Sequence, residues 1–281
     1  MAGPGRTCPR CGRLPADSEF LSFAPELDAG NEFIEADSFE RLARLEDGSF
    51  WFRARNELIV WAVRRYSPSA SSFLEVGCGT GFVMHGLHKA FPAMALTGAE
   101  IHKDALRFTK RRVPDAVLLQ MDARKILFDS EFDAAGAFDV IEHIDEDAEV
   151  LAQMRRAVRP GGVVLASVPQ HRWLWSTADD FAHHRRRYRR KELKRKAEEA
   201  GLRVEAAISF VSVLLPLLLA SRVRQRGELE SYDPGGELQF SRRIDRSLEA
   251  AMTLERWLIK RRLRFPAGGS VLLIARRPNG S

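Results

Sequence analysis

The chain has 281 residues, is 45% hydrophobic and carries 44 Lys and Arg against 38 Asp and Glu. That size and apolar fraction predict one α/β domain with additions, and they exclude a disordered or disulfide-rich class. The sequence has no run of about 18 apolar residues and no apolar N-terminal stretch of the secretory kind, which favours a cytoplasmic protein. Peripheral contact with the inner membrane face is left open.

The three cysteines are too few for a disulfide framework. Cys8 and Cys11 have the C-x-x-C spacing of a zinc knuckle, but a closed structural zinc site needs four ligands and the second half-site is missing. We therefore expect no bound metal, with zinc at these two cysteines as the alternative. Residues 1–38 are interpreted as a leader and residues 39–70 as a helical cap, whose amphipathic helix opens at Phe50.

A glycine-dense turn follows the cap. The apolar segment from Phe73 to Val76 runs into Gly77, Gly79 and Gly81 and then into a helical pattern. Because glycine permits positive φ and leaves no Cβ between the backbone and a ligand, the turn predicts a loop that cradles a nucleotide. A dinucleotide fingerprint would place its third glycine at Phe82, whose side chain is too large for close approach to a pyrophosphate.

Further apolar segments follow at the spacing of strands that alternate with helices, and three of them end at acidic residues. The first ends at Glu100, the second at Asp122 and the third at Asp139. A helix to Val158 and an R-P-G-G turn then lead to a fifth strand. This alternation predicts a parallel sheet covered on both faces, with the acids at the carboxyl ends of strands, where ligands bind. The expected strands are 93–99, 116–120, 132–138 and 163–168.

The E-x-G-x-G-x-G loop, the two acids after it, the D-x-x-E-H segment from Asp139 and the R-P-G-G turn resemble the class I S-adenosylmethionine-dependent methyltransferases, in particular a type 11/12/23-like bacterial group. The resemblance covers residues 50–202 and, more loosely, the final strand. It implies a doubly wound, seven-stranded, mostly parallel Rossmann-like sheet with an antiparallel last strand. It also implies S-adenosyl-L-methionine as the cofactor.

The same resemblance implies roles for individual residues. Glu100 is expected to accept from the ribose hydroxyls, unless it is a surface residue that opens the next helix. Asp122 is expected to accept from the adenine amine, with a helix N-cap as a compatible alternative. Arg55 is expected to pair with the methionine carboxylate, with ordinary packing as the alternative. The expected cofactor-binding residues are Trp51, Arg55, Glu75, Gly77, Cys78, Gly79, Gly81, Glu100, Ile101, Asp122, Ala123, Phe138 and Asp139.

The loop after the fifth strand, residues 169–188, is dense in polar and aromatic groups, as loops that carry substrate chemistry often are. It resembles the L-W-S, D and H-x-R-R-Y pattern of a bacterial methyltransferase group, with His183 in place of a small residue. We expect His184, and after it His143, as a general base, with Tyr188 or Arg187 orienting an anionic group of the substrate. The alternative is that the histidines only support the fold.

Two segments depart from the regular alternation. Residues 183–196 form a cationic block that predicts contact with phosphate polyanions or an anionic membrane, or else a solvated helix face. Residues 208–220 are apolar and contain Pro216, and they are interpreted as a lid, an interfacial segment or core packing. The predicted divisions are a methyltransferase core at 71–207, an inserted lid or membrane-facing segment at 208–243, and a C-terminal helix and strand at 244–281.

These features favour in-line methyl transfer to a small-molecule or lipid-linked acceptor, a reaction that depends mainly on proximity and orientation. No D-P-P-Y or N-P-P-Y sequence follows the fourth strand, which argues against amino methylation of bases or glutamine by the families that use it. The alternatives are RNA methylation through residues 183–196 and a non-catalytic protein that binds the cofactor or a membrane.

Overall fold

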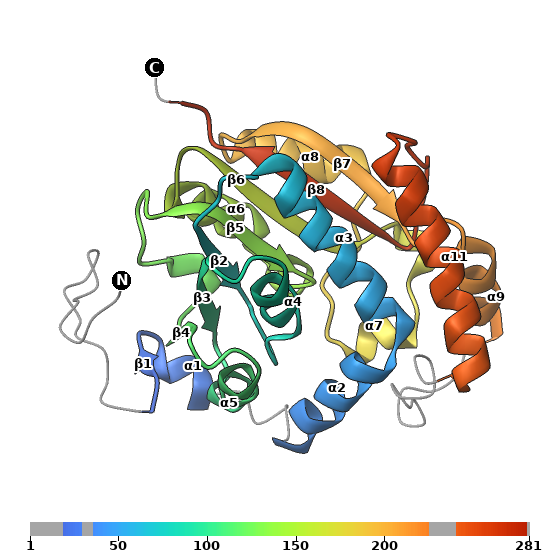
Figure 1. Cartoon of the computed structure of the whole chain (residues 1–281), viewed down its shortest axis with the longest axis horizontal. Coiled ribbons are helices and arrows are strands. Elements are labelled where there is room, and N and C mark those ends of the chain that lie inside the picture. Colours follow the sequence, from blue (N-terminus) through green and yellow to red (C-terminus); the bar gives the residue numbers. More distant parts are fainter. Residues whose placement is uncertain (1–18, 30–35, 225–239, 280–281) are drawn as a thin grey trace.

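An eight-stranded sheet organises the protein, whose computed structural model describes residues 19–29, 36–224 and 240–279 (Figure 1). The strand order is β1-β4-β3-β2-β5-β6-β8-β7. Strands β1 to β6 pair in parallel, and β8 is antiparallel to both β6 and β7. The strands are β1 (Leu21–Ser22), β2 (Ser72–Val76), β3 (Ala95–Glu100), β4 (Val117–Gln120), β5 (Phe132–Phe138), β6 (Val158–Pro169), β7 (Arg203–Phe210) and β8 (Ser270–Arg276).

Helices cover both faces of the sheet (Figure 1). In the described ranges they are α1 (Pro25–Ala29), α2 (Ala36–Gly48), α3 (Phe50–Tyr66), α4 (Phe82–Ala90), α5 (Lys103–Arg112), α6 (Asp147–Ala157), α7 (Thr177–Phe181), α8 (Arg190–Glu199), α9 (Leu215–Arg224) and α11 (Arg242–Lys260). Short 3₁₀ turns are η1 (Ala123–Lys125), η2 (Ile141–His143) and η3 (Arg172–Leu174). Among the described helices, none combines the length and apolarity that crossing a membrane requires.

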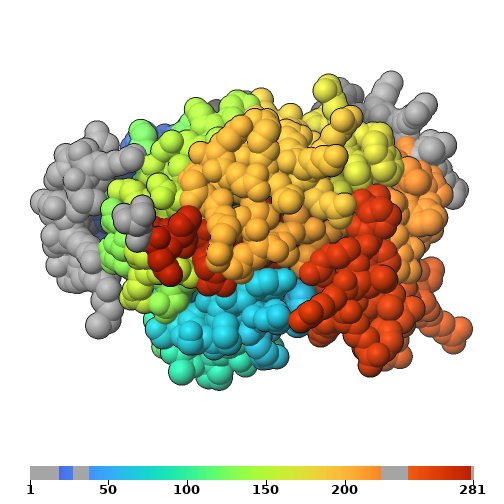
Figure 2. Space-filling model, turned by 90° about the horizontal axis from the view of Figure 1, so that it is seen from above, coloured from blue at the N-terminus to red at the C-terminus, as the bar shows by residue number. Residues whose placement is uncertain are grey.

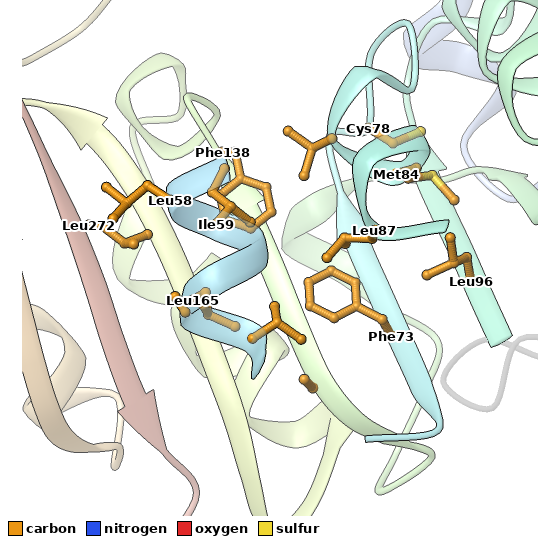
Figure 3. Packing of buried hydrophobic residues seen from close by; sticks show 14 of the residues in the cluster. Leu58, Ile59, Phe73, Cys78, Met84, Leu87, Leu96, Phe138, Leu165 and Leu272 are labelled. Atoms are coloured by element: carbon orange, nitrogen blue, oxygen red, sulfur yellow. The ribbon is translucent and has the colours of Figure 1, made fainter. Parts of the chain in front are cut away.

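Alternate residues of the strands feed two hydrophobic clusters, one on each face of the sheet. On β2, Phe73 lies in the cluster that contains Leu58 of α3 and Leu87 of α4 (Figure 3). Its neighbour Leu74 lies in the cluster that contains Val150 of α6. Each fully buried side chain of this size contributes about 1.5–3 kcal/mol to stability. The two clusters hold the carboxyl ends of β2, β3 and β5 at one edge of the sheet.

The predicted doubly wound, mostly parallel sheet with an antiparallel strand near its edge is confirmed. The leader adds an eighth strand, which the sequence did not predict: the two residues of β1 pair with β4. The R-P-G-G segment is not a turn between a helix and a strand. Phe132 pairs with Val158 and Ala134 with Val163, so the residues between them form a bulge within β6, with Gly161 at a φ of 79°.

The apolar run 208–220 is divided between two elements. Ile208 and Phe210 complete β7 and are buried in the core, three residues beyond the expected boundary at 207. Leu217 of α9 is 53% exposed, so core packing accounts for only the first part of the run. Glu255 of α11 fixes the connection, because its Oε2 accepts from the N–H groups of Ser212 and Val213, both at 2.7 Å.

Candidate functional site

The three glycines after β2 serve different purposes. Gly77, Gly79 and Gly81 have φ angles of 68°, 51° and 79°, where L side chains are strained. A Cβ at Gly77 would lie 2.5 Å from Val140, and one at Gly81 would lie 2.8 Å from Thr109. A Cβ at Gly79 would meet nothing within 4 Å. The outer glycines therefore allow close packing, whereas Gly79 faces open space that a ligand could fill.

Glu100, at the end of β3, lies directly beside Gly79. Its Oε2 accepts from the Gly79 N–H at 2.9 Å, and its Oε1 accepts from the Ile101 N–H at 2.8 Å. The residue is 8% exposed. Each carboxylate oxygen can accept more than one hydrogen bond, so the pair of oxygens retains capacity for hydroxyl donors.

Helix α2 is tied to the glycine loop by Glu46, a residue that the sequence interpretation missed. The buried Glu46 carboxylate accepts from the Thr80 hydroxyl and pairs with Arg112. Arg112 also donates to the Thr80 hydroxyl at 2.8 Å and to the Ala43 carbonyl at 3.1 Å. No local pattern marks Glu46, because its partners are at least 34 residues away.

Arg55 projects from α3 toward the end of β5 and pairs with Asp139. Its guanidinium lies 4.8 Å from the centroid of the Trp51 ring and 5.4 Å from that of Phe52. Burial lowers the pKa of Arg55, and nearby Glu46 and Glu75 oppose that shift. The Arg55 Nε is buried without a hydrogen-bond partner among the described residues. The guanidinium is therefore fixed in place and still has a donor to offer.

The other expected cofactor residues lie around the same sheet edge. Asp122 caps η1, since its Oδ1 accepts from the Arg124 N–H at 2.8 Å, so the expected N-cap role is confirmed. Glu75 is fully enclosed, and burial raises its pKa well above the usual range. Cys78 and Phe138 are buried core residues, and burial likewise raises the pKa of the Cys78 thiol. Ala123, the first residue of η1, is also buried.

The expected acceptor-side residues meet at Asp179 of α7. Nδ1 of His184 lies 2.8 Å from the Asp179 Oδ1. Arg187 donates to both oxygens of the same carboxylate, at 2.7 and 2.9 Å. The rings of His143 and His184 lie edge to face with centroids 4.8 Å apart. The structure thus brings both histidines together and commits the Arg187 guanidinium to an internal ion pair.

Tyr188 does not contact the substrate side, which corrects its expected role. Its side chain is fully buried, its hydroxyl donates to the Asp147 Oδ2 at 2.7 Å, and the same hydroxyl oxygen lies 3.2 Å from the Ile141 carbonyl. Burial and the Asp147 carboxylate raise the pKa of the phenol far above its usual range. Tyr188 therefore anchors the segment that carries His184 to the segment that carries His143.

The cationic block 183–196 is partly used inside the protein. Arg186 pairs with Asp147 at 3.1 Å, and Lys196 pairs with the same carboxylate at 2.8 Å. Arg195 pairs with Glu199 on the surface of α8. These internal pairs leave fewer free cations for a polyanion than the sequence suggested.

Two acidic residues of the acceptor side, Asp179 and Glu142, received no role from the sequence interpretation. Asp179 could have been found from the S-x-x-D spacing of a capping box, since its Oδ2 accepts from the Ser176 N–H at 2.8 Å. Glu142 is 0% exposed, and burial raises its pKa to about 8. The Arg185 N–H donates to the Glu142 carbonyl at 2.8 Å, which holds the two segments side by side.

The described residues of this site include neither the C-x-x-C cysteines nor the lining of a surface hollow. Cys8 and Cys11 lie outside the described residues. A surface hollow of about 310 Å³ lies near the amino end of β6, away from the glycine loop, and contains none of the expected site residues. Its lining is Arg203, Arg276, Arg277, Pro278 and Asn279.

Comparison with known proteins agrees with this arrangement. The fold and glycine loop define a Rossmann-like nucleotide-binding domain, and residues 74–166 match the family model described as a methyltransferase domain. The curated relatives of the chain include a probable S-adenosylmethionine-dependent methyltransferase, which is 29% identical over 165 residues.

Two sugar methyltransferases are among its curated relatives. The chain is 41% identical over 107 residues to the dTDP-3-amino-3,6-dideoxy-alpha-D-glucopyranose N,N-dimethyltransferase of Streptomyces fradiae, a match that covers 37% of this chain and 41% of the relative. It is 34% identical over 107 residues to the dTDP-3-amino-3,4,6-trideoxy-alpha-D-glucopyranose N,N-dimethyltransferase of Streptomyces venezuelae, covering 37% of this chain and 44% of the relative. The chain thus spans less than half the length of these relatives.

A solved structure of similar fold is phosphoethanolamine N-methyltransferase 2 of Haemonchus contortus in complex with S-adenosyl-L-methionine. It aligns with a TM-score of 0.59 at 17% identity and covers 90% of this chain and 60% of the other. At that identity the similarity supports the fold alone.

Proposed function

We propose that the protein is an S-adenosylmethionine-dependent methyltransferase that acts on a small-molecule acceptor. The observation that carries this proposal is the open space at Gly79, next to the Glu100 carboxylate, at the carboxyl ends of β2 and β3. A nucleoside needs a backbone without a Cβ to lie against and an acid for its ribose, and these two residues offer both. The methyltransferase family match covers the same loop.

When bound, the cofactor supplies a methyl group on a positively charged sulfur, already activated for transfer. The protein's part is to hold the cofactor in position and exclude water. In this proposal Glu100 accepts from the ribose, Asp122 accepts from the adenine amine, and Arg55 donates to the methionine carboxylate through its free Nε. Trp51 and Phe52, stacked on Arg55, shield that end from solvent.

The acceptor is proposed to lie against His143 and His184, beyond Asp139 at the end of β5. The two sugar N,N-dimethyltransferases among the relatives support a small polar acceptor. Asp179 engages Nδ1 of His184, which leaves Nε2 as the nitrogen that can act on the acceptor. The expected general base is one role for this nitrogen.

Transfer of a labelled methyl group tests the proposed activity. Purified protein is incubated with methyl-labelled S-adenosylmethionine and a panel of aminosugar nucleotides, small amines and phenols, and then with extracts of the native host. Incorporation into a small molecule is expected, and it should disappear in Glu100→Ala. Label found only in RNA would support the RNA alternative instead. Absence of transfer, with S-adenosylmethionine not bound either, would contradict the proposal.

We further infer that α11 rests on an anionic membrane surface. Arg243, Arg246, Leu254, Trp257 and Arg261 are exposed and recur at intervals of three, four or eight residues, so they share one face of the helix. The guanidinium of Arg261 lies 4.1 Å from the centroid of the Trp257 ring. Apolar side chains flanked by arginines suit acyl chains below anionic headgroups. Figure 2 shows α11, in red-orange, at one end of the molecule, where such a contact is sterically accessible.

Vesicle sedimentation tests this contact. Binding to vesicles that contain anionic phospholipid is expected, with little binding to pure phosphatidylcholine, and Trp257→Ala should weaken it several-fold. Trp173→Ala is the matched control, since Trp173 is 55% exposed and Trp257 is 47% exposed. Equal binding of both variants and the parent protein would contradict the inference.

A further inference from the structure

Three side chains on the acceptor side have the composition of a metal site. One ligand atom each from Glu142, His143 and His184 lies within 4.8 Å of the others. Glu142 and His143 come from η2, and His184 comes from the loop before α8, so the cluster joins segments about 40 residues apart. Two imidazoles and one carboxylate form a common ligand set for divalent transition ions that keep open positions for substrate or water.

The buried Glu142 carboxylate supports a metal site independently of the ligand spacing. The residue is 0% exposed, and neither of its oxygens makes a hydrogen bond to another described residue. A buried carboxylate without partners is costly, and such groups normally pair with a cation or coordinate a metal. The neighbouring arginines do not fill this need, because Arg55 pairs with Asp139 and Arg187 pairs with Asp179.

The surroundings also orient the imidazoles as ligands. The Asp179 Oδ1 lies 2.8 Å from Nδ1 of His184, and Arg187 and the Ser176 N–H fix that carboxylate. This contact selects the tautomer in which Nδ1 carries the proton and Nε2 presents its lone pair. A carboxylate behind a histidine ligand is the usual outer support of metal-binding imidazoles. The His143 ring lies edge to face with the His184 ring, with the two centroids 4.8 Å apart.

We propose that Glu142, His143 and His184 bind one divalent transition metal ion, with Asp179 and Arg187 as positioning residues behind His184. The remaining coordination positions suit an oxygen or nitrogen of the acceptor. Binding of the ion is a property of this cluster alone, whereas a role in holding the acceptor rests on the proposed methyl transfer. In the metal-bound protein, Nε2 of His184 is a ligand and not a general base.

Metal titration of chelator-treated protein tests the site without any methyl acceptor. The Cys8→Ser/Cys11→Ser background removes the competing C-x-x-C thiols. Calorimetry with Zn²⁺ and with Mn²⁺ should give one site for at least one of these ions, with a Kd of about 10 µM or lower. Co²⁺ should give visible absorption bands that report imidazole ligation.

Variants assign the ligands. Glu142→Gln and His184→Ala should each weaken binding at least about 10-fold, and Asp179→Asn should weaken it by roughly 10-fold. His88→Ala, in the last turn of α4, is the matched histidine control and should leave binding unchanged. Circular dichroism establishes that each variant is folded. No site tighter than millimolar, or binding that is equal in Glu142→Gln, His184→Ala and the parent, would overturn the proposal.

Metal binding and methyl transfer can fail separately. A bound ion without methyl transfer to any acceptor would leave the site standing and contradict the proposed activity. Methyl transfer by parent protein that binds no ion in the titrations would support the activity and overturn the metal site.

Discussion

The proposed cofactor side and the proposed acceptor side of this protein are built in different ways. The cofactor side is a continuous stretch, in which backbone groups of the glycine loop meet Glu100 from the neighbouring strand. The acceptor side is assembled from side chains of η2 and of the loop after β6, joined through Asp179. The cofactor side needs glycines, because a side chain would fill the space for a ligand. The acceptor side needs polar side chains from two segments to meet.

This difference explains which of the two proposed sides carries a local sequence pattern. A glycine loop has a local pattern, because the backbone conformation that it needs is encoded by residues next to one another. A polar cluster has no such pattern, because its members meet only after the sheet has formed. The two sides should therefore respond independently to mutation.

The largest expected effect is on turnover. His184→Ala should lower methyl transfer at least about 100-fold, whether Nε2 acts as a base or ligates a metal. The affinity for S-adenosylmethionine should stay within about threefold of the parent, because His184 lies on the acceptor side. Labelled methyl transfer and calorimetry measure the two quantities. Full turnover in this variant would remove His184 from the site.

The complementary change is Gly79→Val on the cofactor side. The new side chain occupies the open space that we assign to the cofactor, and an overpacking cost of about 1–3 kcal/mol corresponds to an affinity loss of roughly 5- to 150-fold. Gly48→Ala is the control, since a Cβ there also meets nothing within 4 Å but the φ angle is not positive. If calorimetry gave equal cofactor affinity for Gly79→Val and Gly48→Ala, the cofactor would not occupy the space at Gly79, which contradicts the proposed cofactor side.

Tyr188→Phe separates support of the fold from contact with substrate. Loss of the hydroxyl removes its buried hydrogen bond to the charged Asp147 carboxylate, which should lower the free energy of unfolding by about 1–3 kcal/mol. Urea denaturation measures this change. Below the unfolding temperature, turnover should stay close to that of the parent. A large loss of turnover with unchanged stability would restore the substrate role that the sequence suggested.

The smallest expected effect is on the free energy of unfolding, and it concerns Asp133, near the amino end of β5. Partial burial disfavours the Asp133 carboxylate, but hydrogen bonds from Ser71 and Ser72 and contact with Arg159 outweigh it and lower the pKa of Asp133 to about 2. Since the folded pKa is below the unfolded value of 3.8, this stabilisation is present above about pH 4 and is lost as the pH falls through 2.

Asp133→Asn should therefore lower the free energy of unfolding by about 1 kcal/mol at pH 7, with a smaller difference at pH 3, because solvent screens this partly exposed group. Urea denaturation at both pH values measures it, and cofactor affinity should not change. A difference that grows on acidification would contradict the assigned pKa.

Most of the fold was accessible from the sequence because it rests on local patterns. Consecutive apolar residues such as Phe73 and Leu74 mark a strand buried on both faces, and the acids at the strand ends follow from the same register. The two-residue strand β1 could not be predicted, because it is held by pairing with β4 and by the Ser22 hydroxyl donating to Gln120 at 2.7 Å. Neither contact has a local signature.

Of the candidate site, the sequence located the histidines but not their environment. Tyr188 was assigned to the substrate from its place in the H-x-R-R-Y pattern, yet its ring is fully buried in the core. Glu142 was passed over because the sequence cannot show that a carboxylate is buried without partners. Burial and hydrogen bonding are tertiary properties, and they decide what these side chains can do.

The most direct test of the central claim is a crystal structure of the protein soaked with S-adenosylmethionine. We expect the ribose hydroxyls at the Glu100 carboxylate, the adenine amine near Asp122 and the cofactor lying against the backbone of Gly79. A structure in which the compound is absent from this loop, or bound elsewhere while the loop remains ordered and open, would contradict the account.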